Sequence, residues 1–358
     1  MTANKFRLSR FEMCAARYSI VRPAYQATVS IALRDQANSA VPVQHSTTMT
    51  QLDDQQALVL AALLAMQRQS WEQGVASHAA LDLGEFDIAR RMAIDSVTRQ
   101  APDGRLAEVD GAGLVNSGSV AEVVQWAGEN EALARQKAWL LDSCPRATDG
   151  TLFHIHGTRE MWVDSVYMVV PALVVLGETD AAASQFRGHK LRLFDEAAGL
   201  WAWRYDEDSR RVTHPVHWGT GNGWVVAGLA RAIRSLPDGE LARDFAEHAR
   251  LVIDAMLALR ASSGSFHNVL DDESTFTDGT TGMMLAFAIL EGVRGGWLPE
   301  SYREHGNSIV DFSRSLVDEN GFVREVCGAP HFDHQGTSAE AQSFFLLATA
   351  AQNRDVAG

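Results

Sequence analysis

A regular succession of helical segments constrains this chain more than any other feature. From residue 53 onward, apolar residues recur at helical spacing in segments that pair across short loops. The first helix of each pair is expected near residue 56, 116, 161, 221, 280 or 337, so the pattern repeats every 45 to 60 residues. The predicted pairs are 56–83 with 86–98, 116–128 with 131–141, 161–176 with 180–194, 221–235 with 241–260, and 280–293 with 300–317, while 337–352 begins a sixth.

Such hairpins can bury their apolar faces only against one another. Six hairpins without an evident capping repeat predict an all-α fold that closes into an (α/α)6 barrel. Strand-like alternation is confined to short pieces, at 199–205 and 264–269.

Clusters rich in Trp, His and Gly fall just before the first helix of a pair. These clusters are residues 105–118, 153–164, 214–224, 266–280 and 328–340. In a closed array of hairpins these loops meet at one mouth, and loops on a rigid scaffold are where binding sites are usually built. We therefore expect the functional site at that mouth.

The overall composition excludes several classes of function. The formal net charge is −14 and no Lys/Arg cluster offsets it, so we expect no nucleic-acid partner. No apolar run approaches the roughly 18 residues that a membrane span needs, and no membrane partner is expected. Three widely spaced cysteines (Cys14, Cys144, Cys327) favour a reducing compartment, which predicts a cytoplasmic location. The sequence leaves the oligomeric state open.

Residues 1–50 differ from the rest, because they are basic and poor in acidic residues. No unbroken apolar segment follows the early charges, so a secretory signal is not expected. An organellar transit peptide and a dispensable tail both fit this composition, and we favour a disordered tail. Residues 51–358 are then the (α/α)6 domain.

Asp164 is the acidic residue with the most distinctive surroundings. It lies at a predicted helix start inside an apolar stretch, Met161–Val170. It is either a helix-capping carboxylate or a general acid that apolar walls keep protonated, and spacing alone favours the cap. His154 and His156 resemble a metal-binding pair, but no third ligand has a clear spacing, so no metal site is expected.

The segment His214–Trp224 carries three glycines between two tryptophans. It does not follow a strand, which argues against a dinucleotide-binding loop. Glycines at a helix start let the backbone approach a ligand, and Trp218 and Trp224 would place a ring on either side of it.

Three other polar groups begin predicted helices. Asn116 opens the second hairpin, and Asp278 is interpreted as a helix cap. Thr337 and Glu340 have the spacing of a capping box, and we expect a structural role for both.

Taken in order, these segments resemble the unsaturated uronyl hydrolases of glycoside hydrolase families 88 and 105, and the rhamnogalacturonyl type most. The similarity covers roughly residues 55 to 350. The matching pieces are His154 with Trp162-Val163-Asp164 and Tyr167-Met168, the loop Trp218–Trp224, and the stretches Phe266–Asp271 and Gly292–Pro299.

The resemblance implies an (α/α)6 barrel that removes a 4,5-unsaturated uronic acid from the non-reducing end of lyase-generated oligosaccharides, without metal or organic cofactor. An aspartic acid at the position of Asp164 protonates the C4=C5 double bond and then acts as base toward water, which adds at C5. The substrate-binding residues that the resemblance implies are Asn116, His154, Trp162, Trp203, His214, His217, Trp218, Thr220, Asn222 and Trp224. The alternatives are an (α/α)6 glycosidase or polysaccharide lyase of different sugar specificity, and a non-catalytic toroid that binds sugar or protein.

Three departures from the family pattern concern the substrate pocket. Asn116 stands where a second aspartate is common, and an amide cannot share a proton. Thr220 replaces an arginine of the rhamnogalacturonyl type, and Trp203 replaces a histidine. The substrate carboxylate then needs another partner, for which the candidates are Arg159, Arg204 and His214.

Overall fold

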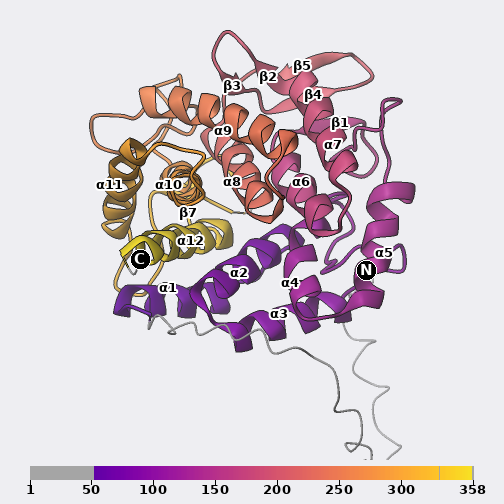
Figure 1. Ribbon diagram of the computed structural model, residues 1–358. Coiled ribbons are helices and arrows are strands. Elements are labelled where there is room, and N and C mark those ends of the chain that lie inside the picture. Colours follow the sequence, from indigo (N-terminus) through magenta and orange to yellow (C-terminus); the bar gives the residue numbers. More distant parts are fainter. Residues whose placement is uncertain (1–51, 330, 357–358) are drawn as a thin grey trace, which may run out of the picture. The chain divides into compact units, whose positions relative to one another are not determined.

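Two concentric layers of helices make up the part of the chain that this computed structural model describes, residues 52–329 and 331–356 (Figure 1). These residues belong to one compact unit, Met49–Gly358. The predicted extension, residues 1–50, lies outside the described residues and stays a prediction.

The inner layer is a closed ring of helices. Around the ring, each member packs against the next and α12 packs back against α2. The members in order are α2 (Ser70–Leu83), the 3-10 helix η1 (Asn116–Val120) with its continuation α4 (Ala121–Trp126), α6 (Ser165–Val175), α8 (Gly219–Ser235), α10 (Gly279–Arg294) and α12 (Ala339–Val356). This closure confirms the predicted (α/α)6 barrel.

The outer layer supplies one helix behind each inner one. In chain order the outer helices are α1 (Asp54–Ala65), α3 (Phe86–Thr98), α5 (Asn130–Ala138) with the π-helical turn η2 (Trp139–Ser143), α7 (Thr179–Leu193), α9 (Glu240–Ala258), and α11 (Arg303–Arg314) after the 3-10 turn η3 (Glu300–Tyr302). The first outer helix, α1, packs against the last inner one, α12, so the two ends of the unit together form one hairpin.

The prediction of one helix over 56–83 is wrong, because the chain breaks between α1 and α2. The Arg68 guanidinium donates to the carbonyl oxygens of Leu63 and Met66, which satisfies the end of α1. The new start is stabilised by a capping box between Gln69 and Glu72.

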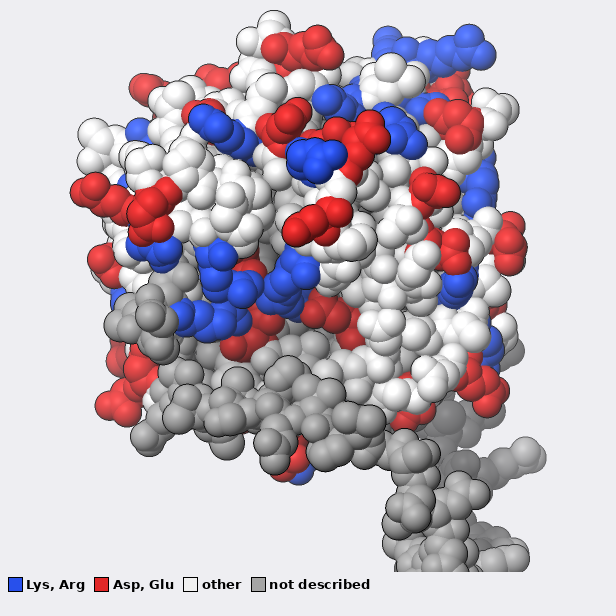
Figure 2. Space-filling model, viewed as in Figure 1, with Lys and Arg blue, Asp and Glu red and all other residues white. Residues whose placement is uncertain are grey.

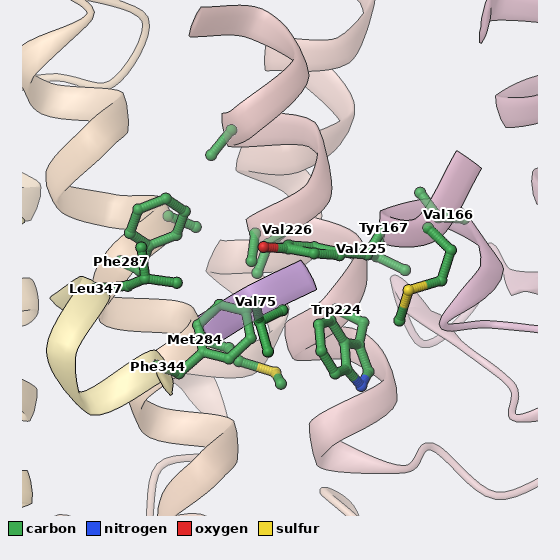
Figure 3. Packing of buried hydrophobic residues seen from close by; sticks show 14 of the residues in the cluster. Val75, Val166, Tyr167, Trp224, Val225, Val226, Met284, Phe287, Phe344 and Leu347 are labelled. Carbon is green, nitrogen blue, oxygen red and sulfur yellow. The ribbon is translucent and has the colours of Figure 1, made fainter. Parts of the chain in front are cut away.

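The inner helices are buried on nearly every side, as their composition of small and apolar residues requires. Every residue of α10 from Gly279 to Val293 is buried. Figure 3 shows side chains of α2, α6, α8, α10 and α12 meeting near the middle of the ring, with Tyr167, Trp224 and Phe344 in edge-to-face contact. Close approach also depends on glycine, since a Cβ on Gly228 would lie 2.8 Å from the Tyr167 Cα.

Short strands decorate one end of the barrel. The largest sheet has the order β1-β4-β5, made by β1 (Glu160–Trp162), β4 (Arg204–Asp206) and β5 (Arg211–His214). Two smaller ribbons pair β2 (Phe194–Asp195) with β3 (Leu200–Trp201), and β6 (Val326–Cys327) with β7 (Gln335–Gly336). The predicted strand segment 199–205 is confirmed in β3 and β4, whereas 264–269 contributes only isolated bridges.

Buried and partly buried ion pairs join the opposite ends of the inner helices. Arg231 on α8 is 1% exposed and bonds Glu122 at 2.8 Å, and it lies 3.5 Å from Asp82 on α2. Arg354 on α12 bonds Glu291 on α10 at 2.6 Å. These pairs connect helices that are distant in sequence.

The surface carries charges of both signs, and on the face seen in Figure 2 basic side chains lie among acidic ones. None of the described helices is long and apolar enough to cross a membrane. Cys144 and Cys327 are buried free thiols, and Cys14 lies outside the described residues.

Candidate active site

A cavity of about 310 Å³ opens at the N-terminal ends of the inner helices. Its walls come from segments that precede or begin α2, η1, α6, α8 and α12. The lining residues are Trp71, Asp110, Ala112, Gly113, Asn116, His154, Ile155, Trp162, Asp164, Trp203, Arg204, Trp218, Trp224, His331, Phe332 and Glu340. The expectation that the Trp-, His- and Gly-rich loops meet at one mouth is thus confirmed for four of the five clusters.

The fifth cluster, 266–280, lies behind the wall and supports it. Asn268 accepts a hydrogen bond from the Trp218 indole N–H at 3.2 Å. Asp278 caps α10 as predicted, since its carboxylate accepts from the Thr280 N–H at 3.0 Å, and it also accepts from the Thr220 hydroxyl at 2.5 Å.

Asp164 immediately precedes α6, but its side chain makes no capping hydrogen bond. Its backbone is already helical, with φ −67° and ψ −16°, whereas a capping residue is usually extended. The interpretation of Asp164 as a helix cap is therefore wrong. Its side chain is 15% exposed and lines the cavity, and Oδ1 is buried without a hydrogen-bond partner among the described residues.

His154 lies beside this carboxylate. Its Nε2 is 3.6 Å from the Asp164 Oδ2, and its Nδ1 is 2.9 Å from the Ser165 hydroxyl. The ring stacks on Trp162 with centroids 4.5 Å apart and an interplanar angle of 10°. Burial lowers the pKa of His154 although the Asp164 charge opposes this, so the imidazole is neutral at neutral pH. It therefore faces Asp164 as a neutral ring and not as a cation.

Arg204 is the cation of the cavity wall, and the β1-β4-β5 sheet positions it. Trp162 of β1 is in register with Arg204 of β4, and a bulge follows between Arg204 and Tyr205. The guanidinium lies between two indole rings, 3.8 Å from the Trp162 centroid and 4.0 Å from the Trp203 centroid. Its Nε is buried without a partner among the described residues. Burial lowers the pKa of Arg204, which stays charged at neutral pH.

Glu340 is a second carboxyl group in the cavity wall, in the first turn of α12. The predicted capping box with Thr337 is wrong, because the Ser338 hydroxyl accepts from the Ala341 N–H in its place. Glu340 instead accepts a hydrogen bond from the Trp71 indole N–H at 3.3 Å.

Unpaired buried polar atoms gather at this cavity. Buried polar groups in proteins almost always have hydrogen-bond partners, and exceptions call for an explanation. Among the described residues, five lining side chains carry such an atom: Asn116 Oδ1, Asp164 Oδ1, Trp203 Nε1, Arg204 Nε and Glu340 Oε1. A polar ligand in the cavity would provide hydrogen-bond partners for these donors and acceptors.

Seven of the eleven residues that the sequence predicts for the site line the cavity. They are Asn116, His154, Trp162, Asp164, Trp203, Trp218 and Trp224. The tryptophans form much of the wall, with Trp203 and Trp218 centroids 5.4 Å apart. Their faces are suited to stacking on an apolar sugar face.

The other four lie outside the lining. Thr220 is fully buried against Asp278, and Asn222 is fully buried with its amide bonded to the Trp201 and Trp218 backbone. His217 bonds Asp271 at 2.6 Å, and His214 is an exposed residue of β5 whose ring packs on Trp203. Their predicted contact with substrate has no support in this geometry, and they hold the loop that carries Trp218.

Sequence reasoning missed Trp71, Asp110, His331 and Phe332 and gave Glu340 a structural role. The one available signal was position, because each precedes or begins an inner helix, as the predicted site residues do. No cluster of three or more His, Cys, Asp or Glu among the described residues could hold a metal ion. That the reaction needs no metal or organic cofactor stays a prediction.

The fold and the cavity define a helical-barrel protein with a carbohydrate-type site. The chain belongs to Glycosyl Hydrolase Family 88, whose sequence profile matches residues 127–352. The resemblance noted in the sequence is confirmed.

Two curated relatives carry names of the expected kind. The unsaturated rhamnogalacturonyl hydrolase YesR of Bacillus subtilis (strain 168) is 23% identical over 218 residues, which are 55% of this chain and 59% of the relative. The unsaturated 3S-rhamnoglycuronyl hydrolase of Alteromonas sp. (strain LOR) is 24% identical over 163 residues, 41% of this chain and 40% of the relative. The matches thus span less than two thirds of either relative.

The fold has solved counterparts. A possible member of family GH105 from Klebsiella pneumoniae subsp. pneumoniae MGH 78578 superposes with a TM-score of 0.73 at 19% identity. The superposition covers 90% of this chain and 100% of that structure. At this identity the likeness concerns the fold alone.

Proposed function

We propose that this protein removes a 4,5-unsaturated uronic acid from the non-reducing end of a lyase-generated oligosaccharide. The proposal rests on Asp164, a largely buried aspartate whose side chain caps no helix. In the same Trp-lined cavity lie hydrogen-bond donors and acceptors that have no partner among the described residues. A volume of about 310 Å³ lies at the lower end of the range for small-molecule sites, which suits one terminal sugar. The relatives' names support the same substrate class.

The chemistry is hydration of a vinyl ether. Protonated Asp164 transfers its proton to C4, and the C4=C5 electron pair forms the new C–H bond, leaving an oxocarbenium ion at C5. The Asp164 carboxylate then takes a proton from a water whose oxygen bonds to C5. The resulting hemiketal opens and releases the aglycone with a free hydroxyl group. One carboxyl thus serves both as acid and as base.

Arg204 is the proposed partner of the substrate carboxylate. Of the three candidates from the sequence, only Arg204 lines the cavity. Arg159 is half-exposed and bonds Asp208 at 2.9 Å, and His214 is exposed. The N-terminal ends of α2, α6, α8 and α12 also face this end of the barrel, and their dipoles favour an anion there.

Asn116 fits a role in binding. Its amide lines the cavity and its Oδ1 is unpaired, so it accepts a hydrogen bond from a sugar hydroxyl. An amide does not titrate, and the proton needed for the reaction therefore comes from a carboxyl group.

We place the protein in the cytoplasm, because Cys144 and Cys327 are buried free thiols.

The test is loss of ultraviolet absorbance when the conjugated double bond of an unsaturated uronide is hydrated. The purified full chain is mixed with lyase-digested pectin, glycosaminoglycan and gum oligosaccharides in turn. Decay on one class identifies the aglycone type. No decay on any class contradicts the proposal and favours a glycosidase or lyase of another specificity, or a non-catalytic toroid.

The first mutational prediction concerns Asp164. Asp164→Asn keeps the side-chain volume but removes the transferable proton, so turnover should fall by at least about a thousandfold. Because the carboxylate makes no capping bond, the thermal midpoint should remain within about 2 °C of the parent. A variant that unfolds instead would show that Asp164 is structural.

A further inference from the structure

Glu340 lies in the same cavity as Asp164 but comes from the far end of the chain. It is 2% exposed, and its side chain leaves the first turn of α12 toward the cavity. Oε2 accepts from the Trp71 indole, while Oε1 is buried without a partner among the described residues. Ser338 provides the helix cap, so Glu340 is free of that role.

The surroundings of Glu340 disfavour a negative charge. Burial is the largest influence, and the carboxyl groups of Glu72 on α2, Asp278 before α10 and Asp164 before α6 add repulsion. The hydrogen bond from Trp71 opposes these effects only in part, and the pKa of Glu340 lies well above its usual range. These surroundings favour the protonated form, a carboxylic acid with one O–H donor.

A buried hydrogen-bond donor in the wall of a polar cavity is suited to binding a polar group of a ligand. Neutral acids in apolar sites can donate hydrogen bonds that an ionised carboxylate cannot. The Trp71 N–H holds Oε2 as the acceptor, which leaves the unpaired Oε1 to carry the proton. The Asn116 side chain also has an unpaired oxygen, but it is an amide and cannot become an O–H donor.

We propose that Glu340 is a substrate-binding residue whose carboxyl group, held by Trp71, donates a hydrogen bond from Oε1 to a hydroxyl oxygen of the terminal sugar. This assignment rests on the proposed function for the identity of the sugar. It requires no charge on Glu340 and no proton transfer from it.

Two substitutions distinguish this role from the alternatives. Glu340→Gln retains a carbonyl acceptor for Trp71 and an N–H donor in the position of Oε1, so it should recover most of the kcat/KM that Glu340→Ala loses. Glu340→Ala loses the donor, so kcat/KM should fall by about tenfold or more, chiefly through KM. Equal loss in both variants would show that a titrating carboxyl is needed and would overturn the proposal. Unchanged kinetics in Glu340→Ala would also overturn it.

An infrared measurement tests the protonation without substrate. The parent spectrum at neutral pH should contain a carbonyl band of a protonated carboxyl group that is absent from Glu340→Gln. The matched control is Glu207→Gln, a partly buried acid outside the cavity lining that pairs with Arg192 at 3.0 Å, in which this band should persist. Absence of the band from the parent overturns the proposal even if Glu340→Ala fails to fold. Failure of the parent to hydrate any unsaturated uronide contradicts the proposed function and leaves the infrared result unaffected.

Discussion

Arg204 owes its place to two tryptophans that also line the cavity. Its guanidinium is stacked on the Trp162 and Trp203 rings and keeps an unpaired Nε. A planar, weakly hydrated guanidinium group can stack in this way and still bind a carboxylate, whereas a lysine ammonium is a more strongly hydrated point charge. Trp203 thus supplies one side of this stacking arrangement and Trp162 the other.

Arg204→Lys should therefore keep the charge and lose the binding geometry. Loss of a charge-assisted hydrogen bond costs about 1.5–3 kcal/mol, so KM should rise by about 10- to 100-fold. Steady-state kinetics on the preferred unsaturated uronide measures this. Arg159→Gln is the matched control, since Arg159 lies outside the lining and pairs with Asp208. An equal rise of KM in both variants would argue against a specific carboxylate partner.

At the scale of single elements, the short helix η1 is the least expected member of the inner ring. It is a 3-10 helix of five residues that packs against both α2 and α6. A Cβ on Gly118 would lie 2.1 Å from the Met168 carbonyl oxygen, so only glycine fits there. The same packing aligns Asn116 at the start of η1 with Asp164 at the start of α6.

Gly118→Ala should separate these two elements. Overpacking of this kind costs about 1–3 kcal/mol, and urea unfolding should show it as a lowered midpoint. Activity should fall as well, because Asn116 and Asp164 would move apart. Gly239→Ala is the control, since a Cβ there meets no atom closer than 3.7 Å. Equal stability of Gly118→Ala and the parent would contradict the packing argument.

On the scale of the whole barrel, the two ends of the inner helices have different tasks. The N-terminal ends hold the cavity with its unpaired atoms, and the C-terminal ends hold Arg231, Arg354 and their carboxylate partners. The burial of Glu122 alone would raise its pKa, but the charges of Arg231 and Arg234 lower it to about 2. Removing one member of such a pair would leave the other charge buried without a partner, which is costly.

The barrel should lose stability on acidification below neutrality. Burial lowers the pKa to about 3 for His78, about 4 for His189 and about 3 for His248. Between these values and the ordinary 6.5, the unfolded chain binds protons that the folded chain excludes. Stability therefore falls as pH drops through this window, by up to about 1.4 kcal/mol per pH unit for each histidine.

Urea midpoints measured between neutral and acidic pH test this. Below the ordinary glutamate value, protonation of Glu122 should add to the loss, since its folded pKa is also depressed. His248→Gln keeps an acceptor for the Trp201 indole N–H. It should reduce the dependence of the urea midpoint on pH by the contribution of one histidine. A profile that does not change across the histidine window would refute the buried neutral state.

Local patterns in the sequence were sufficient for the fold class. Helical periodicity is repeated in every hairpin, and the prediction of six hairpins required only that each apolar face be covered. The break between α1 and α2 was missed because no Pro or Gly marks it and the closing bonds come from Arg68. The pairing of α1 with α12 joins the two ends of the unit, and no local pattern records such a contact.

The sequence by itself singled out Asp164 as a candidate site residue, the family of the protein and the loops that form the mouth. These depend on residue types in a fixed order. Tertiary structure decided which polar groups reach the cavity. It excluded Asp164 as a cap, selected Arg204 over Arg159 and His214, and turned Thr220 and Asn222 into supports. It also placed Glu340 among three other carboxyl groups. Burial and the charges of distant neighbours determine protonation, and these exist only once the ring of helices has closed.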